Sequence, residues 1–175
     1  MKKGMVLLFS LLFLLTGLPG CSFDSEGPED VTIKFINALF VRSKDGKPTA
    51  EERFEAILSV FDESVTDELK ESLDFHEEKD EMLEFLEEVG KKGITGVYFI
   101  AENPDEPQTE SYSNLWVKIP ASSLPEADKR NGEESAILNI ILQRRGEEWK
   151  VVDIHDDTES LNEKKIDWIE VKPYR

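Results

Sequence analysis

The spacing of apolar and polar residues changes character once along the chain, at Gly93. Before this point, from Pro28 onward, apolar residues recur at intervals of three and four, which is the period of an amphipathic helix. After it, apolar and polar residues alternate over short runs that are rich in β-branched and aromatic side chains, as in strands. Because the two parts are segregated, the pattern predicts an α+β fold, with N-terminal helices packed on a curved antiparallel sheet of about four strands.

Three helical regions are expected before the change of period. The first begins at Pro28, which suits the first turn of a helix, and the second at Thr49, where Glu52 completes a capping box. The third covers about 64–89 and stops at Gly90. The apolar stripes of these helices are interpreted as core residues: Phe35, Ile36, Leu39, Phe40, Phe54, Ile57, Leu58, Phe61, Met82, Phe85, Leu86 and Val89.

The second part of the chain contains four expected strands, at 94–102, 111–120, 134–143 and 147–156. Within the second strand, alternate residues face opposite sides. One side carries Leu115, Val117 and Ile119, and the other carries Tyr112, Asn114, Trp116 and Lys118. The folded domain is therefore expected to span 28–157, and the C-terminal extension 158–175 could add an edge strand.

The first twenty residues have a different pattern. Lys2 and Lys3 give a basic start, Met5 to Leu15 is almost entirely apolar, and small or turn-forming residues follow at 16–20. This order is typical of a secretory signal peptide. The apolar run is too short to span a bilayer comfortably, since about 20 apolar residues are needed.

The sole cysteine of the chain, Cys21, comes next. One cysteine cannot form an internal disulfide, and no Cys/His spacing suggests zinc. A catalytic thiol would need a base such as His76 or His155, although position 21 lies at the edge of the domain. An ordinary secretory peptide with an incidental cysteine is a further alternative.

The four residues Leu18-Pro19-Gly20-Cys21 resemble the lipobox of bacterial lipoproteins, and this interpretation is favoured over the others. The resemblance implies signal cleavage between Gly20 and Cys21 and a diacylglyceryl thioether on Cys21. Two acyl chains anchor a protein stably, since each buried methylene contributes about 0.8 kcal/mol. We therefore expect 21–27 to be a lipid-anchored tether, with membrane lipid as a partner, at the extracytoplasmic face of a bacterial cell membrane or envelope.

The charge narrows the choice of partners. The chain has 38 Asp and Glu against 21 Lys and Arg, a net charge of −17, and removal of the signal peptide takes away two more basic residues. Such a surface repels nucleic acid and anionic head groups, so no nucleic-acid partner is expected. It suits cationic partners, or it serves solubility alone.

Two segments of the domain carry a family resemblance, PEDVTIKFINALF at the start and GEEWKVVDIHDD near the end. Together they resemble the nuclear transport factor two-like superfamily, whose cone-shaped fold is shared with ketosteroid isomerases. The similarity is greatest to the small lipoprotein-borne domains of unknown function in that superfamily, and it covers about 28–157. The chain departs from the family in its long acidic helical region and in its tail after Asp157.

Candidate chemistry is concentrated in the run from Asp153 to Asp157 (DIHDD). In a regular strand, Asp153 and His155 point to the same side as Trp149 and Val151. If that side lined the cone, Asp153 could orient His155 as a general base. Pocket-lining residues would then be Tyr112, Trp116 and Asn139. The alternative is a strand end that emerges into solvent.

No cofactor or metal is expected. The same acidic run could attract a divalent cation, but it lacks the glycine that shapes a calcium loop. The run from His76 to Glu81 is interpreted as a solvated helix junction rather than as a metal site.

These features favour a membrane-anchored binding or accessory module of the cell envelope, with an envelope protein or a small ligand as its partner and no catalysis. The alternative is an isomerase- or dehydratase-like enzyme that uses a cone pocket with Asp153 and His155. A third hypothesis makes the acidic helical region a contact surface for an envelope complex. The enzyme hypothesis requires Asp153 and His155 to face an enclosed pocket.

Overall fold

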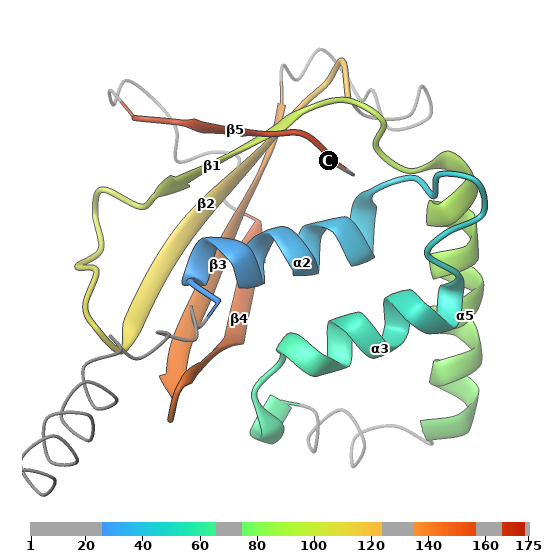
Figure 1. Ribbon diagram of the computed structural model, residues 1–175, viewed down its shortest axis with the longest axis horizontal. Helices are drawn as coiled ribbons and strands as arrows, with labels where there is room; N and C mark the ends of the chain where they lie inside the picture. The colour runs from blue at the N-terminus through green and yellow to red at the C-terminus, as the bar shows by residue number, and fades with distance from the viewer. Residues whose placement is uncertain (1–25, 66–74, 124–134, 157–165, 174–175) are drawn as a thin grey trace, which may run out of the picture.

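The computed structural model describes residues 26–65, 75–123, 135–156 and 166–173. Figure 1 shows helices followed by strands along this part of the chain. The helices are α2 (Pro28–Phe40), α3 (Ala50–Val60) and α5 (Phe75–Lys92), and the strands are β1 (Tyr98–Glu102), β2 (Tyr112–Pro120), β3 (Ser135–Arg145), β4 (Glu148–Asp156) and β5 (Ile169–Val171). The predicted α+β class is confirmed.

The strands form one open antiparallel sheet in the order β4-β3-β2-β1-β5, and the helices pack on one of its faces (Figure 1). About four strands were expected, and the described sheet has five. The fifth, β5, lies in the C-terminal extension and pairs with β1, where Phe99 stands opposite Glu170. The extension thus supplies an edge strand.

The two faces of the sheet differ as the alternation of β2 predicts. Leu115, Val117 and Ile119 belong to the core, and α2 packs on this side. We call it the inner face. The outer face is the opposite side, which in β2 carries Tyr112, Asn114, Trp116 and Lys118.

A β-bulge changes the alternation within β4. The register places Val151 opposite Leu142 but Asp153 opposite Ile141, so that one extra residue separates these two pairs. Val151 therefore lies in the core on the inner face, whereas Asp153 and His155 lie on the outer face. The prediction that all four alternate residues of β4 share one side is wrong, because the bulge inserts a residue that a sequence pattern does not reveal.

The predicted starts of the first two helices are confirmed, but the third helical region was expected from about 64 to 89, and α5 spans Phe75–Lys92. In α3, the Thr49 hydroxyl accepts a hydrogen bond from Glu52 N (3.3 Å) and the Glu52 carboxylate accepts one from Thr49 N (2.8 Å). In α5, the helix continues past Gly90 to Lys92. The lack of a Cβ at Gly90 leaves room for Ser43, because a Cβ there would lie 3.0 Å from Ser43 Oγ.

The core faces of α3 and α5 agree only in part with the predicted stripes, although Phe54 and Phe61 still pack against the core. In α3 the buried residues are Arg53, Ile57 and Val60, and the predicted Phe54, Leu58 and Phe61 are half-buried. In α5, Leu86 is fully buried, but Met82 and Phe85 are 39% and 47% exposed. The reason in α3 is that the face turned toward α2 carries a buried arginine rather than an apolar side chain.

Arg53 closes the C-terminal end of α2. Its Nη1 donates to the carbonyl oxygens of Asn37 (3.2 Å) and Ala38 (2.8 Å), and its Nη2 donates to Val41 O (2.6 Å) and Ser43 Oγ (2.9 Å). The last carbonyls of a helix have no partner within the helix, and a positive charge at this end is favourable. One side chain therefore fixes α2, α3 and the segment between them.

We expect Arg53→Met to lower the free energy of unfolding by about 3 kcal/mol, because it leaves buried carbonyl groups without charged hydrogen bonds. Urea denaturation of the purified protein measures this change. Arg42→Met is the matched control, since Arg42 is exposed, and it should cost less than about 0.5 kcal/mol. Equal losses in the two variants would contradict the assigned role.

A second polar contact joins the exit of α3 to the β3–β4 hairpin. Asp62 N donates to Val151 O (3.0 Å), and the Asp62 carboxylate accepts hydrogen bonds from Ser64 Oγ (2.6 Å) and from Arg145 Nε. The bonds from Ser64 and then Arg145 lower the pKa of Asp62 from 3.8 to about 2. A lowered pKa in the folded state stabilises the protein above pH 3.8, and this contribution is lost as the pH falls toward 2.

We expect Asp62→Asn to lower the stability at pH 7 by about 1 kcal/mol, a modest figure because Arg145 is half-exposed. The difference from the unchanged protein should shrink between pH 4 and pH 2. Chemical denaturation at a series of pH values measures both effects. Asp80→Asn, which removes an exposed carboxylate of α5, controls for the loss of one charge; a pH-independent difference for Asp62→Asn would refute the assignment.

Candidate functional site

The structure brings the predicted site residues together on the outer face. Cross-strand pairing places Trp116 of β2 opposite Asn139 of β3, and Asn139 opposite His155 of β4. Tyr112 lies on the same face of β2, nearer the start of the strand. The side chains of Asp153 and His155, on the same strand, are in contact, with 3.0 Å between His155 Nε2 and Asp153 Oδ2.

The Asp153–His155 pair is open to solvent. The side chains are 53% and 54% exposed, and both lie on the face opposite the helices. A general base usually lies in a cleft that excludes water, whereas both of these side chains are more than half exposed. The condition that the enzyme hypothesis set, an enclosed pocket around these two residues, is not met.

The neighbouring part of the outer face is buried and polar. Trp116 and Asn114 are each only 2% exposed. Among the described residues, Trp116 Nε1, Asn114 Oδ1 and Asn139 Oδ1 are buried without a hydrogen-bond partner. One donor and two acceptors therefore lie close together on β2 and β3. A buried polar atom without a hydrogen bond lowers the stability of the fold, because it has lost its contact with water.

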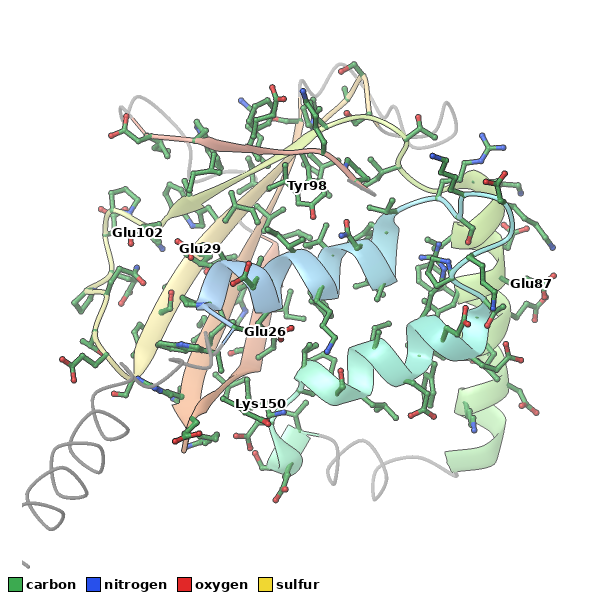
Figure 2. All side chains as sticks on the ribbon, in the orientation of Figure 1. Glu26, Glu29, Glu87, Tyr98, Glu102 and Lys150 are labelled. Carbon is green, nitrogen blue, oxygen red and sulfur yellow. The ribbon has the colours of Figure 1, made fainter. Side chains whose placement is uncertain are left out.

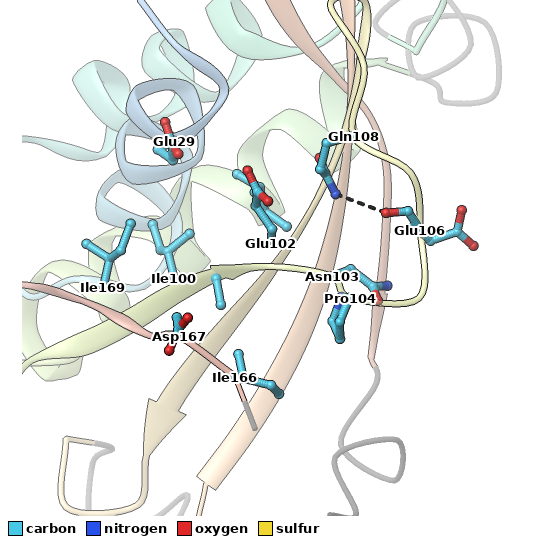
Figure 3. Close-up of a pocket in the computed structure, with 12 residues that line it drawn as sticks. Glu29, Ile100, Glu102, Asn103, Pro104, Glu106, Gln108, Ile166, Asp167 and Ile169 are labelled. Atoms are coloured by element: carbon cyan, nitrogen blue, oxygen red, sulfur yellow. Dashed lines mark hydrogen bonds between the residues drawn. The ribbon is translucent and has the colours of Figure 1, made fainter. Parts of the chain in front are cut away.

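A cavity of about 690 Å³ lies elsewhere, between the start of α2, the end of β1 and the start of β5 (Figure 3). Figure 2 places Glu29 of α2 and Glu102 of β1 on this side of the molecule. Twelve described residues line the cavity: Glu29, Ile100, Ala101, Glu102, Asn103, Pro104, Glu106, Gln108, Leu115, Ile166, Asp167 and Ile169. None of the predicted site residues is among them.

The lining of this cavity combines apolar and acidic groups. Ile100 and Leu115, each 1% exposed, form apolar wall on the inner face, and Ile169 is 57% exposed. Four carboxylates also line it, and none of the described lining residues is Lys, Arg or His. The arrangement suits a ligand that is partly apolar and positively charged.

The loop after β1 is held in place by side-chain hydrogen bonds. Gln108 Nε2 donates to Asn114 O (3.0 Å), and Gln108 Oε1 accepts from Asn114 N (3.0 Å). Asn103, which is 6% exposed, accepts from Asp105 N (2.9 Å). This wall of the cavity is therefore fixed by the polypeptide itself.

Sequence reasoning missed the cavity because four separate segments of the chain form it. One local signal was present. Glu102 continues the alternation of Tyr98 and Ile100, and it therefore occupies an inward-facing position at the end of an apolar strand.

The remaining predictions concern metals, the membrane and the N-terminal segment. Within the described ranges, no three His, Cys, Asp or Glu side chains gather as a metal site. Over the same ranges, no helix is both long and apolar enough to cross a bilayer. Gly20 and Cys21 lie outside the described residues, and the side chain of His76 is likewise outside what the structure describes.

Comparison with known proteins adds no family to this account: no protein-family model, curated protein or solved structure matches the chain.

We expect His155→Gln to change the free energy of unfolding by less than about 0.5 kcal/mol, because exposed ion pairs contribute little. Thermal denaturation at pH 5.5 and at pH 8 measures this. A loss of more than 2 kcal/mol at either pH would mean that the pair is part of a buried network, contrary to its exposure.

Proposed function

We propose that the protein is a lipid-anchored binding module at the extracytoplasmic face of a bacterial membrane, and that the cavity beside α2 is its ligand site. The cavity carries this proposal. It has the volume of a small-molecule site, which is commonly about 300–1,000 Å³, and it combines apolar walls with a few polar groups. A binding module needs no catalytic residues.

The anchor is supported by the lipobox-like Leu18-Pro19-Gly20-Cys21 and by the position of α2. The helix begins at Pro28, so only the short segment 21–27 separates Cys21 from the folded domain. Membership of the nuclear transport factor two-like superfamily is part of the proposal. Its support is the order of helices before an antiparallel sheet, with a cavity where the first described helix meets the inner face.

The isomerase- or dehydratase-like alternative receives less support. It assigned general-base chemistry to His155 and Asp153, which are exposed on the outer face and lie outside the cavity lining. The cavity itself offers carboxylates and no imidazole among its described residues.

We expect Cys21→Ala to abolish incorporation of a labelled fatty acid into the protein in bacterial cells, because the thiol that carries the lipid is lost. Metabolic labelling and membrane fractionation measure the result. Ser25→Ala, a change within the same tether, is the matched control and should remain labelled and membrane-bound. Labelling of the Cys21→Ala variant at the level of the control would refute the anchor.

A further inference from the structure

We infer that the cavity binds a small organic cation with an apolar part, taken up near the membrane surface. The chemical class follows from the residues of the cavity. The location rests on the proposed lipid anchor.

The charge of the ligand follows from two carboxylates. Glu29 stands in the first turn of α2 and Glu102 at the end of β1, on different walls of the cavity (Figure 3). Neither carboxylate forms an ion pair or a hydrogen bond with a side chain of the described residues. Lys91 and Lys92 of α5, by contrast, pair with glutamates of the same helix. Both carboxylates are exposed to solvent and no described lining residue is basic, so a positive group between Glu29 and Glu102 is attracted by both.

The apolar part of the ligand follows from the residues beside these carboxylates. Ile100 and Leu115 line the cavity from the inner face of the sheet. Ile169, in β5, and Ile166, just before β5, line it from the other side of β1. Ile169 is one of the few large apolar side chains that the described surface exposes. Because Ile100 and Leu115 are already buried, Ile169 and the half-buried Ile166 supply the apolar surface that a ligand can cover. An alkyl or aromatic group gains from covering it, whereas a hydrated metal ion does not.

The size of the cavity favours a small molecule over a protein surface. Its volume of about 690 Å³ is that of a typical small-ligand site. A protein partner would cover a wider and flatter area than this cavity provides.

The tether places the cavity close to the bilayer. Seven residues, 21–27, precede Pro28, and a fully extended chain of this length spans about 25 Å at most. Glu29 lines the cavity one residue further on. Anionic lipids give a membrane a negative surface potential that decays within a Debye length of about 8–10 Å. Organic cations with an apolar part accumulate in this layer, and the tether is long enough to hold the cavity at its edge.

The test uses full-length lipidated protein in nanodiscs of zwitterionic lipid, with empty nanodiscs as the reference for partitioning. Isothermal titration compares hexyltrimethylammonium with tetramethylammonium, which lacks the chain, and with hexanoate, which reverses the charge. Hexyltrimethylammonium should bind about tenfold more tightly than either comparator, because only it uses both the carboxylates and the apolar walls.

Variants locate the binding. Glu29→Gln combined with Glu102→Gln should weaken hexyltrimethylammonium binding about tenfold, and Ile169→Ser should weaken it several-fold. Glu81→Gln combined with Glu84→Gln removes the same charge from the exposed surface of α5 and should leave the affinity unchanged.

Two results overturn the ligand class: hexanoate binding as tightly as hexyltrimethylammonium, or equal losses in the two double variants, which would indicate a general effect of net charge. Either can occur while Cys21 is lipidated, and the proposed anchor then stands without this ligand. If Cys21 is not lipidated but the cation still binds at Glu29 and Glu102, the chemical class stands and uptake near the membrane is refuted.

Discussion

The contact between the Arg53 guanidinium and the end of α2 is the interaction on which the arrangement of the helices depends. Arg53 is fully buried, and its four hydrogen bonds hold the last carbonyls of α2 and the hydroxyl of Ser43. Ser43 in turn packs against Gly90 of α5, whose carbonyl accepts from Ser43 N (2.9 Å). A buried charge is tolerated only where such partners surround it. With its C-terminal end fixed, α2 lies across the inner face and its first turn brings Glu29 to the end of β1, which is where the cavity forms.

The features that the sequence predicts well are those that depend on neighbouring residues. Pro28 and the Thr49–Glu52 capping box mark helix starts, and the alternation of β2 separates a buried apolar face from a polar one, because both patterns are local. The burial of Arg53 could not be predicted in this way, since a periodicity of apolar residues overlooks a charged side chain whose partners lie more than ten residues away. Gly90 resembles a helix stop, yet it lies within α5, where the lack of a Cβ leaves room for Ser43 Oγ.

The candidate site also shows that a sequence pattern overlooks residues that come together only in the fold. Asp153 and His155 stood out because they are adjacent in sequence, and the strand pairing does place His155 beside Asn139 and Trp116. The bulge in β4 places Asp153 and His155 on the outer face, away from the cavity. Glu29, Glu102 and Ile169 are far apart in the sequence and did not stand out as a group, although the fold assembles them around one cavity. Their chemistry, two carboxylates with apolar walls, agrees with the acidic character of the whole chain.

The central claim is that this cavity, rather than the acidic surface in general, binds the apolar cation. Methyl-resolved NMR during titration with hexyltrimethylammonium tests it most directly, because isoleucine methyl groups are present both in the cavity and elsewhere. The account predicts saturable shifts for Ile100 and Ile169 and none for Ile141, which lies on the outer face. Shifts confined to Ile141 or to Met82 of α5, with Ile100 and Ile169 unchanged, would contradict it.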